Sequence, residues 1–177
     1  LCEDVALVSC PVVLIDRLTQ CGWCDAVGFD NYLGGRLAAR YLLEGGHTRI
    51  GIVTGDIAES SAAERRRGFV DAVEQSGKHF DSSLCVEGDY RFDSGYRAAD
   101  QIIDGGATAV FCCNDVMALG FRQRMAERGL HVTEDMQVIG YDNILKRFGL
   151  GWRMTTVEQS VADLAAACWG MLRKRID

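Results

Sequence analysis

Carboxylates, amides and one tyrosine recur in this chain directly after short apolar runs. The places are Asp16-Arg17, Asp30-Asn31, Asp56, Asp89-Tyr90, Asn114-Asp115 and Asp142-Asn143. Carboxylate and amide groups can bind paired hydroxyls, and an aromatic ring can cover the apolar face of a sugar or a base. One such residue after a strand is usually a helix cap. Their repetition through one chain indicates a binding edge for a polyol or a similar small molecule.

None of the common catalytic motifs is present in the sequence. There is no glycine-rich phosphate loop, no Gly-x-Ser-x-Gly nucleophile elbow and no His-Glu-x-x-His zinc motif. The composition leaves a hydrolase with two catalytic carboxylates as an alternative, but nothing in the sequence distinguishes one pair of carboxylates from the others. We therefore expect a binding protein rather than an enzyme, with no catalytic residue, no cofactor and no metal.

These polar residues need strands and helices that bring them to one edge. Residues 109–113 form an apolar run without alternation, as in a strand buried on both faces of a parallel sheet. Asn114 can then cap a helix that places Met117, Phe121 and Met125 on one face. The rest of the chain repeats this plan. We therefore predict the α/β fold class with parallel βαβ sheets, whose strands present their carboxyl ends at one edge.

Two further helices carry specific expectations. Gly34-Gly35 are expected to lead into a helix that Gly45-Gly46 terminate. The final helix has apolar residues at a spacing of three and four, which predicts a face turned toward a core. That face consists of Val161, Leu164, Ala165, Cys168, Met171 and Leu172.

Composition and charge exclude several classes of protein. The chain has 177 residues, 48% of them hydrophobic and 25% charged, and a net charge of -6, so it can bury an ordinary globular core. A domain that holds DNA through phosphate contacts needs a basic face. The basic runs at 65–67 and 173–175 both lie in predicted helices. We expect no direct nucleic-acid binding by this chain and, since no apolar run is long enough to span a bilayer, no membrane contact.

Eight cysteines raise the question of a disulfide or metal site. Cys112 and Cys113 lie in a predicted buried strand, where free cysteine is a common small core residue. Cys21 and Cys24 match the spacing of redox and zinc pairs, but no second pair follows and the histidines are scattered. The first residues also lack the basic start of a secretory signal. We expect a reduced, cytoplasmic protein, and a role for Cys21 and Cys24 stays open.

Seven segments, in order and with consistent spacing, resemble the sensor domain of LacI/GalR-type bacterial transcription repressors. They are residues 12–17, 30–39, 46–51, 64–69, 113–120, 138–143 and 155–157. The resemblance implies a periplasmic-binding-protein-like fold, with two α/β lobes joined by crossing strands and a small effector between them. On that pattern residues 1–29 and 157–177 form an incomplete first lobe, and residues 30–156 form the second lobe.

The resemblance also implies which residues bind the effector. Matching motif by motif gives Asp16, Arg65, Asn114 and Asp142, with Ser61 and Tyr90 as neighbours and Tyr90 as the stacking ring. Each of three residues has a plainer interpretation. Arg65 could be a surface arginine of a helix, Tyr90 could be a core residue, and Asp142 could serve as a helix cap alone.

The sequence lacks several segments of the family pattern. It has no helix-turn-helix head and no hinge helix, and the opening strands of the first lobe and its closing strands are missing. Residues 151–154 stand where the family has a proline before Thr155. We therefore expect a fragment that meets operator DNA only through a head missing from this chain, and a homodimer for the full-length protein.

The resemblance predicts an effector-sensing domain that binds a small sugar and performs no chemistry. Residues 87–92 resemble the ribose and purine branch of the family, which favours a pentose such as ribose over a related polyol or a nucleobase-like effector. One alternative is the solute-binding protein of a sugar transporter, which would be exported and would carry a signal peptide in the complete gene. Another is a sugar-processing hydrolase or kinase, which would show turnover.

Overall fold

The computed structural model describes residues 8–16, 24–144 and 153–176. The chain divides into two compact units. The first unit combines Leu1–Asp30 with Gln159–Asp177, and the second unit is Asn31–Glu158. Most of the described helices and strands belong to the second unit.

The second unit is built on a five-stranded sheet whose neighbouring strands are all parallel. In spatial order the strands are β4 (Cys85–Glu87), β3 (Ile50–Thr54), β5 (Ala109–Cys112), β6 (Gln137–Asp142) and β7 (Thr155–Glu158). Every residue of β3 and β5 is buried, because both faces of the sheet are covered. The α/β class with parallel strands, predicted from apolar runs without alternation, is confirmed.

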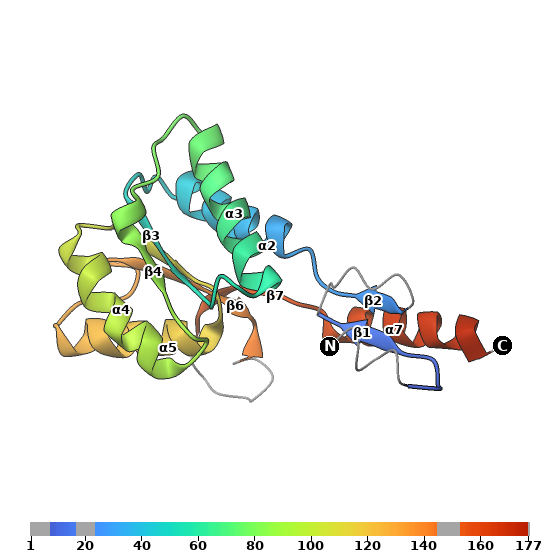
Figure 1. The fold of residues 1–177 in the computed structure, drawn as a ribbon. Coiled ribbons are helices and arrows are strands. Elements are labelled where there is room, and N and C mark those ends of the chain that lie inside the picture. The colour runs from blue at the N-terminus through green and yellow to red at the C-terminus, as the bar shows by residue number, and fades with distance from the viewer. Residues whose placement is uncertain (1–7, 17–23, 145–152, 177) are drawn as a thin grey trace. The chain divides into compact units, whose positions relative to one another are not determined.

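Two pairs of helices cover the two faces of this sheet (Figure 1). The first pair is α2 (Asn31–Glu44) and α3 (Ser60–Gln75), and the second is α4 (Phe92–Asp104) and α5 (Asp115–Glu127). A short 3-10 turn at Ser82–Leu84 precedes β4. Right-handed connections from strand to strand place α3 on one face and α4 and α5 on the other.

Helix α2 begins earlier than the glycine pair predicted. It starts at Asn31, so Gly34 and Gly35 lie inside the helix rather than before it. A Cβ at Gly34 would collide with the Tyr141 ring, and a Cβ at Gly35 would collide with the backbone carbonyl of Arg65. The two glycines therefore serve close packing, and they allow α2 to approach α3 at the level of Arg65.

The core of the second unit is aromatic at its centre. Phe69 of α3 stacks on Phe111 of β5 with 5.5 Å between ring centroids, and Tyr141 of β6 lies 6.2 Å from Phe111. All three side chains are almost fully buried. The inward face expected for α5 is confirmed, since Met117, Phe121 and Met125 are all buried.

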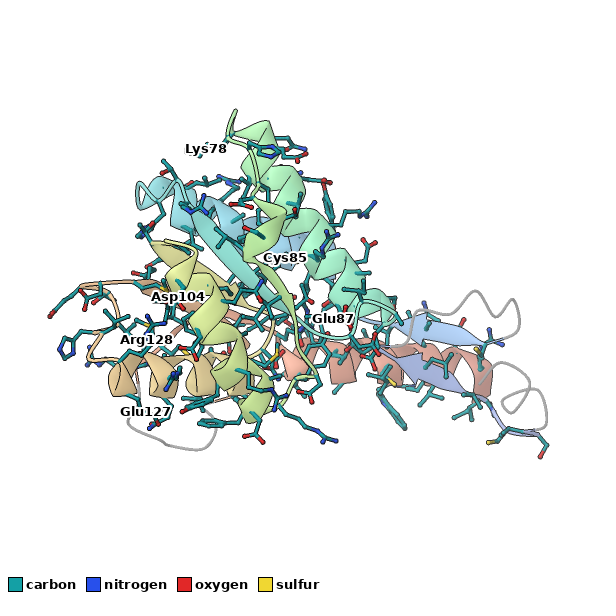
Figure 2. The ribbon with its side chains drawn as sticks, turned by 60° about the vertical axis from the view of Figure 1, so that its left-hand side comes forward. Lys78, Cys85, Glu87, Asp104, Glu127 and Arg128 are labelled. Carbon is teal, nitrogen blue, oxygen red and sulfur yellow. The ribbon has the colours of Figure 1, made fainter. Side chains whose placement is uncertain are left out.

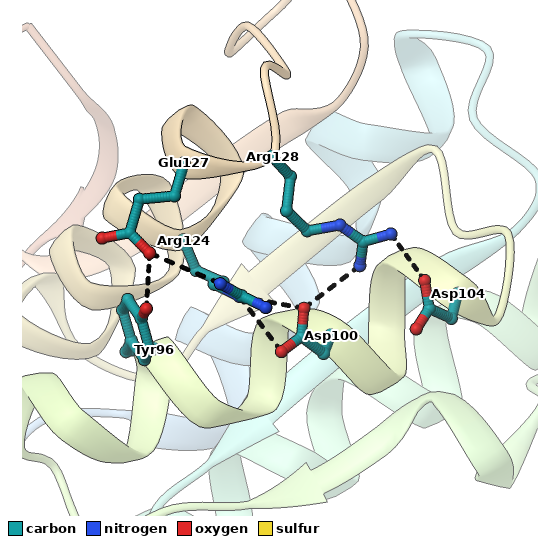
Figure 3. Close-up of polar contacts among 6 residues, drawn as sticks. All are labelled: Tyr96, Asp100, Asp104, Arg124, Glu127 and Arg128. Carbon is teal, nitrogen blue, oxygen red and sulfur yellow. Dashed lines mark hydrogen bonds and ion pairs between the residues drawn. The ribbon is translucent and has the colours of Figure 1, made fainter.

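A polar network joins the outer faces of α4 and α5 (Figure 3). Its members are Tyr96, Asp100, Asp104, Arg124, Glu127 and Arg128, of which Asp104, Glu127 and Arg128 are also labelled in Figure 2. Both oxygens of Asp100 lie 3.0 Å from Nε of Arg124, and Nη1 of Arg128 lies 3.2 Å from Asp100. The second guanidinium nitrogen of Arg128 donates to Asp104 at 2.7 Å. The side chains of both arginines are about 30% exposed, so the network lies at the protein surface.

The first unit contains two short parallel strands and one helix among its described residues. Strands β1 (Val13–Ile15) and β2 (Asp25–Val27) pair with each other, and α7 (Val161–Ile176) packs against both. Arg175 of α7 donates two hydrogen bonds to Asp25, at 2.6 and 3.0 Å. No residue of α7 is fully buried, and its predicted apolar face is only half covered, at Leu164, Cys168, Met171 and Leu172.

Candidate functional site

The second unit places five of the six predicted site residues at the carboxyl end of a strand, in the loop after it, or in the first turns of the helix that follows. Ser61 lies in the first turn of α3 and Arg65 one turn later. Tyr90 lies between β4 and α4, Asn114 precedes α5, and Asp142 is the last residue of β6. Asp16 directly follows β1 of the first unit. The positions agree with the rule that ligands of open α/β sheets bind outside the carboxyl ends of the strands.

Arg65 is buried, with only 5% of its surface exposed, so its interpretation as a surface arginine is wrong. Its Nε donates to Oδ1 of Asn31 at 2.8 Å, and its Nη1 donates to the carbonyl of Cys113 at 2.6 Å. The guanidinium group lies 3.7 Å from the centroid of the Tyr141 ring. These contacts fix the guanidinium plane. Among the described residues Nη2 makes no hydrogen bond, which leaves it as the donor for a ligand.

Asn114 holds two loops together through its amide. Its Oδ1 accepts a hydrogen bond from the backbone N–H of Met117 at 2.8 Å, as a helix N-cap does. Its Nδ2 donates to the carbonyl of Tyr90 at 2.9 Å. The side chain is 8% exposed. An amide has two donor hydrogens and two acceptor lone pairs, so each end of this group retains capacity for a ligand in a fixed orientation.

Tyr90 is half-buried, and its ring packs against the backbone of Gly55, where a Cβ would collide with the ring. Its hydroxyl is buried without a hydrogen-bond partner among the described residues. Burial raises the pKa of Tyr90, while the Ser61 hydroxyl and the charge of Arg65 act in the opposite direction. Ser61 and Arg65 are therefore near the phenol. An unsatisfied buried hydroxyl is unusual and is a natural partner for a bound ligand or water.

Three of the predicted residues have strained backbone. Positive φ angles occur at Asp16 (58°), Tyr90 (64°) and Asp142 (101°), a region that residues other than glycine rarely adopt. Asp16 also has a buried Oδ1 that lacks a hydrogen-bond partner among the described residues. Strain of this kind is retained where the surrounding structure needs the residue in that position, and it concentrates at binding sites. The cap interpretation of Asp142 depends on residues 145–152, which lie outside the described residues, so it stays untested.

Several residues near Arg65 and Tyr90 were not predicted as site residues. Asn31 and Tyr141 contact the guanidinium. Asn31 was part of the strand-end pattern but was not chosen as a site residue, and Tyr141 adjoins Asp142 of that pattern. The carboxylate of Glu59 contributes to the raised pKa of Tyr90, after burial, and so lies near the phenol. The buried Oγ1 of Thr54 has no hydrogen-bond partner among the described residues. Thr54 ends β3, so a strand-end pattern that admitted hydroxyls would have included it.

A separate cavity of about 450 Å³ lies between α2 and the edge strand β7. Leu37 and Tyr41 of α2 and Thr155 and Val157 of β7 are among its lining residues. None of the six predicted residues lines it. It is therefore separate from the residues that the sequence predicted as the site.

The described cysteines do not form a metal or redox site. No group of three or more His, Cys, Asp or Glu residues suited to a metal ion occurs in the described part of the chain. Cys112 and Cys113 are free and buried, and burial raises the pKa of Cys113 to about 12, so its thiol stays protonated. Cys24 is also free, whereas Cys21 lies outside the described residues. None of the helices described here has the length and apolarity to cross a membrane.

Comparison with known proteins agrees with this architecture. Residues 39–177 match the family model of the periplasmic binding protein-like domain. The chain is 37% identical over 171 residues to the HTH-type transcriptional repressor PurR of Pasteurella multocida, covering 96% of this chain and 51% of that protein. The PurR repressor of Escherichia coli is 37% identical over 169 residues, with 94% and 50% covered. The chain thus spans about half the length of the curated relatives it matches.

Solved structures of regulators superpose closely on this fold. A LacI-family transcriptional regulator from Enterococcus faecium with bound ribose has a TM-score of 0.85 at 30% identity, covering 94% of this chain and 62% of that one. A sugar-binding LacI-family regulator from Escherichia coli, complexed with phosphate, has a TM-score of 0.87 at 26% identity, covering 99% and 64%. The chain belongs to the periplasmic-binding-protein-like family, as an effector-binding domain of the LacI family of transcription regulators.

Proposed function

We propose that this chain senses a small hydroxylated effector, with a pentose such as ribose favoured, and performs no chemistry on it. Ser61, Arg65, Tyr90, Asn114 and Asp142 of the second unit and Asp16 of the first unit are the proposed contacts. The effector would change operator binding by a helix-turn-helix head that lies outside these residues. The whole protein would be a cytoplasmic homodimer.

The observation that carries this proposal is the fixed guanidinium of Arg65. Its Nε and Nη1 are committed to Asn31 and Cys113, and its plane rests on Tyr141. A donor held in this way needs little ordering when a ligand arrives, which favours affinity. Uncharged hydroxyl oxygens accept hydrogen bonds from a guanidinium, and they donate to the carboxylates of Asp16 and Asp142.

The half-buried ring of Tyr90 supports a ligand with an apolar face. Its hydroxyl lacks a hydrogen-bond partner among the described residues, and it lies near Ser61. A sugar ring offers a weakly polar face to an aromatic side chain and hydroxyls to the groups around it. The relatives include a regulator solved with ribose and one described as a cellobiose complex. A nucleobase-like effector stays the second candidate, because a flat base also stacks on tyrosine.

The proposed regulation is a shift between two arrangements of the protein. An effector shifts such an equilibrium only by the difference in its affinity for the two arrangements. The same free energy must appear as a change in operator affinity. A solute-binding protein would use the same fold without this coupling, and purified protein that binds a sugar but never changes its affinity for DNA would favour that alternative.

The test is a thermal denaturation series with pentoses, hexoses, nucleosides and purines. A ligand at about 100 times its dissociation constant adds about 2.7 kcal/mol to the free energy of unfolding. We expect ribose or a close relative to raise the midpoint, and Ser61→Ala to reduce the rise. Arg65→Ala should cost about 2–5 kcal/mol of ligand binding in a calorimetric titration.

Arg67 provides the matched control for Arg65. It lies on the same helix, with 60% of its side chain exposed, and pairs with Glu64 at the surface. We expect Arg67→Ala to keep the ligand-induced rise. An Arg65→Ala protein that folds and binds the ligand as well as Arg67→Ala does would contradict the assignment of Arg65. A cooperative melt that no ligand class shifts would contradict the proposed function.

A further inference from the structure

The buried carboxylate of Asp115 is the strongest feature that the proposed contacts do not use. Asp115 is the first residue of α5 and has 0% of its surface exposed. Its Oδ2 accepts a hydrogen bond from the backbone N–H of Ile144 at 2.7 Å, and its Oδ1 accepts one from the hydroxyl of Thr156 at 2.6 Å. Among the described residues no arginine, lysine or histidine forms an ion pair with it. The donors that bond to this carboxylate among the described residues are therefore uncharged.

The surrounding backbone is shaped to admit the carboxylate. Gly140 of β6 passes so close that a Cβ there would collide with Oδ1 of Asp115. The hydroxyl of Thr156 bonds the carboxylate and also lies 3.3 Å from the backbone N–H of Asn143, for which it is the acceptor. Asp115, Thr156 and the turn after β6 therefore form one connected hydrogen-bond network. In such a network the loss of one member leaves other buried groups unsatisfied.

This network joins two parts of the second unit that have different roles. One part is the turn that contains Asp142 and Asn143, with φ angles of 101° and 56°. The other part is β7, the last strand of the second unit, which ends at Glu158 where the unit itself ends. Asn114, the residue before Asp115, is one of the proposed effector contacts. One carboxylate thus contacts both the turn that carries Asp142 and the strand by which the chain leaves the unit.

A simpler explanation would be the usual preference for acidic residues in the first turn of a helix. That preference comes from the helix dipole and is satisfied at an exposed position. It requires neither the burial of Asp115 nor its bonds to Ile144 and Thr156, which lie 29 and 41 residues away in sequence. Burying a carboxylate is costly unless the fold uses its hydrogen bonds.

We propose that Asp115 is a positioning residue, which holds the strained turn at Asp142 in place for the effector and ties that turn to β7. An effector that contacts Asn114 and Asp142 then stabilises the same hydrogen bonds that order Thr156. Effector binding thereby also orders β7, the strand by which the chain leaves the unit. This inference rests on the proposed function, because Asp142 and Asn114 are effector contacts only under it.

The experiment compares variants of the hydroxyl and of the carboxylate. Thr156→Val removes the hydroxyl at nearly constant volume, and Thr156→Ser restores it. Thr155→Val is the matched control on the same strand, because within the described part of the chain no side-chain hydrogen bond links Thr155 to the network. Asp115→Asn keeps the shape of the side chain but presents an amide N–H₂ to one of the two donors. Each variant is first checked for a cooperative thermal melt.

Two measurements are made on each variant. The first is calorimetric titration with D-ribose as the probe, and we expect Thr156→Val and Asp115→Asn to lose about tenfold in affinity, as for one lost hydrogen bond. Thr155→Val and Thr156→Ser should stay within about twofold of the parent protein. The second is amide hydrogen exchange at Ile144 and in β7, with and without ribose. We expect ribose to slow exchange in β7 of the parent protein but not of Asp115→Asn.

The outcomes separate this inference from the function on which it rests. Equal ribose affinity in Thr156→Val and Thr155→Val, with both folded, would overturn the positioning role. A lower melting midpoint at unchanged affinity would do the same, since it would show a purely structural role. A parent protein that binds no ribose would instead overturn the pentose assignment, and exchange at Ile144 in Asp115→Asn would still decide whether the carboxylate holds the turn. Unchanged exchange there would overturn the inference.

Discussion

One buried arginine and a pair of surface arginines in the second unit use similar chemistry in opposite surroundings. Arg65 is buried and donates to an amide oxygen and a backbone carbonyl while it lies on an aromatic ring. Arg124 and Arg128 lie at the surface and bind carboxylates of α4 and α5 (Figure 3). The surface cluster contains more ion pairs, but water and salt screen them. The comparison teaches that burial and fixed geometry, rather than the number of ion pairs, distinguish Arg65, the arginine that we propose as an effector contact.

The pKa values of the carboxylates Asp100 and Asp115, one in each region, shift in opposite directions. The hydrogen bond from Arg124 is the main reason that the pKa of Asp100 is lowered. Burial raises the pKa of Asp115, although the Thr156 hydroxyl and nearby backbone N–H groups act against it. A surface carboxylate among arginines is therefore stable as an anion. The carboxylate inside the fold retains its charge only through neutral donors, and the structure must hold those donors in place.

The largest expected effect comes from removing the buried guanidinium. Arg65→Ala leaves Oδ1 of Asn31 and the carbonyl of Cys113 without their donor and opens space beside Tyr141. We expect the free energy of unfolding to fall by about 2–5 kcal/mol, as for the loss of a buried charged partner. Urea denaturation measures it, with Arg67→Ala as the control. Similar losses in the two variants would remove the distinction between buried and exposed arginines.

The next expected effect is a pH dependence with opposite sign in the two regions. The pKa of Asp115 is raised in the folded protein above its ordinary value of 3.8, so the folded state holds more protons than the unfolded state above that pH. Stability from this group is fully present below pH 3.8 and is lost as the pH rises through the raised value. Asp100 contributes in the reverse sense, with stability lost as the pH falls through its lowered pKa.

The measurement is urea denaturation of the parent protein and of Asp115→Asn from below pH 3.8 to above it, because the two carboxylates titrate on opposite sides of that value. We expect the stability of the parent relative to Asp115→Asn to decrease as the pH rises, because the variant has no proton to lose. Asp100→Asn is the matched control, and its comparison with the parent should have the opposite slope. Parallel pH profiles for the parent and Asp115→Asn would contradict the direction given for Asp115.

The smallest expected effect belongs to the surface cluster. Arg124→Ala removes the paired contact with Asp100, but the side chain is 31% exposed and Arg128 still contacts the same carboxylate. We expect a loss of stability several times smaller than for Arg65→Ala, and one that shrinks further when salt is added. Thermal denaturation at low and high sodium chloride measures it. A loss as large as that of Arg65→Ala, or one that salt does not change, would show that the surface cluster is more than a screened network.

Local patterns were sufficient for much of the fold. The apolar run at residues 109–113 predicted a strand buried on both faces, and β5 covers Ala109–Cys112. The spacing of Met117, Phe121 and Met125 predicted the inward face of α5. Both are confirmed because burial on this scale follows the period of the element. The predicted start of α2 was wrong. Gly34 and Gly35 do not mark a helix boundary, because they are needed for the close approach of Tyr141 and Arg65. Six site residues were predicted by resemblance, and their contact with an effector stays a prediction.

The sequence by itself determined the alternation of strands and helices, the polar residues at the strand ends and the family, because each depends on residues close together in the chain. Tertiary structure alone decided the partners of those polar residues. The two acceptors for Arg65 lie 34 and 48 residues from it in sequence, and the two donors to Asp115 lie 29 and 41 residues away. Burial, strain and unsatisfied hydroxyls at this edge arise only when the complete sheet and both helix pairs have excluded water from it.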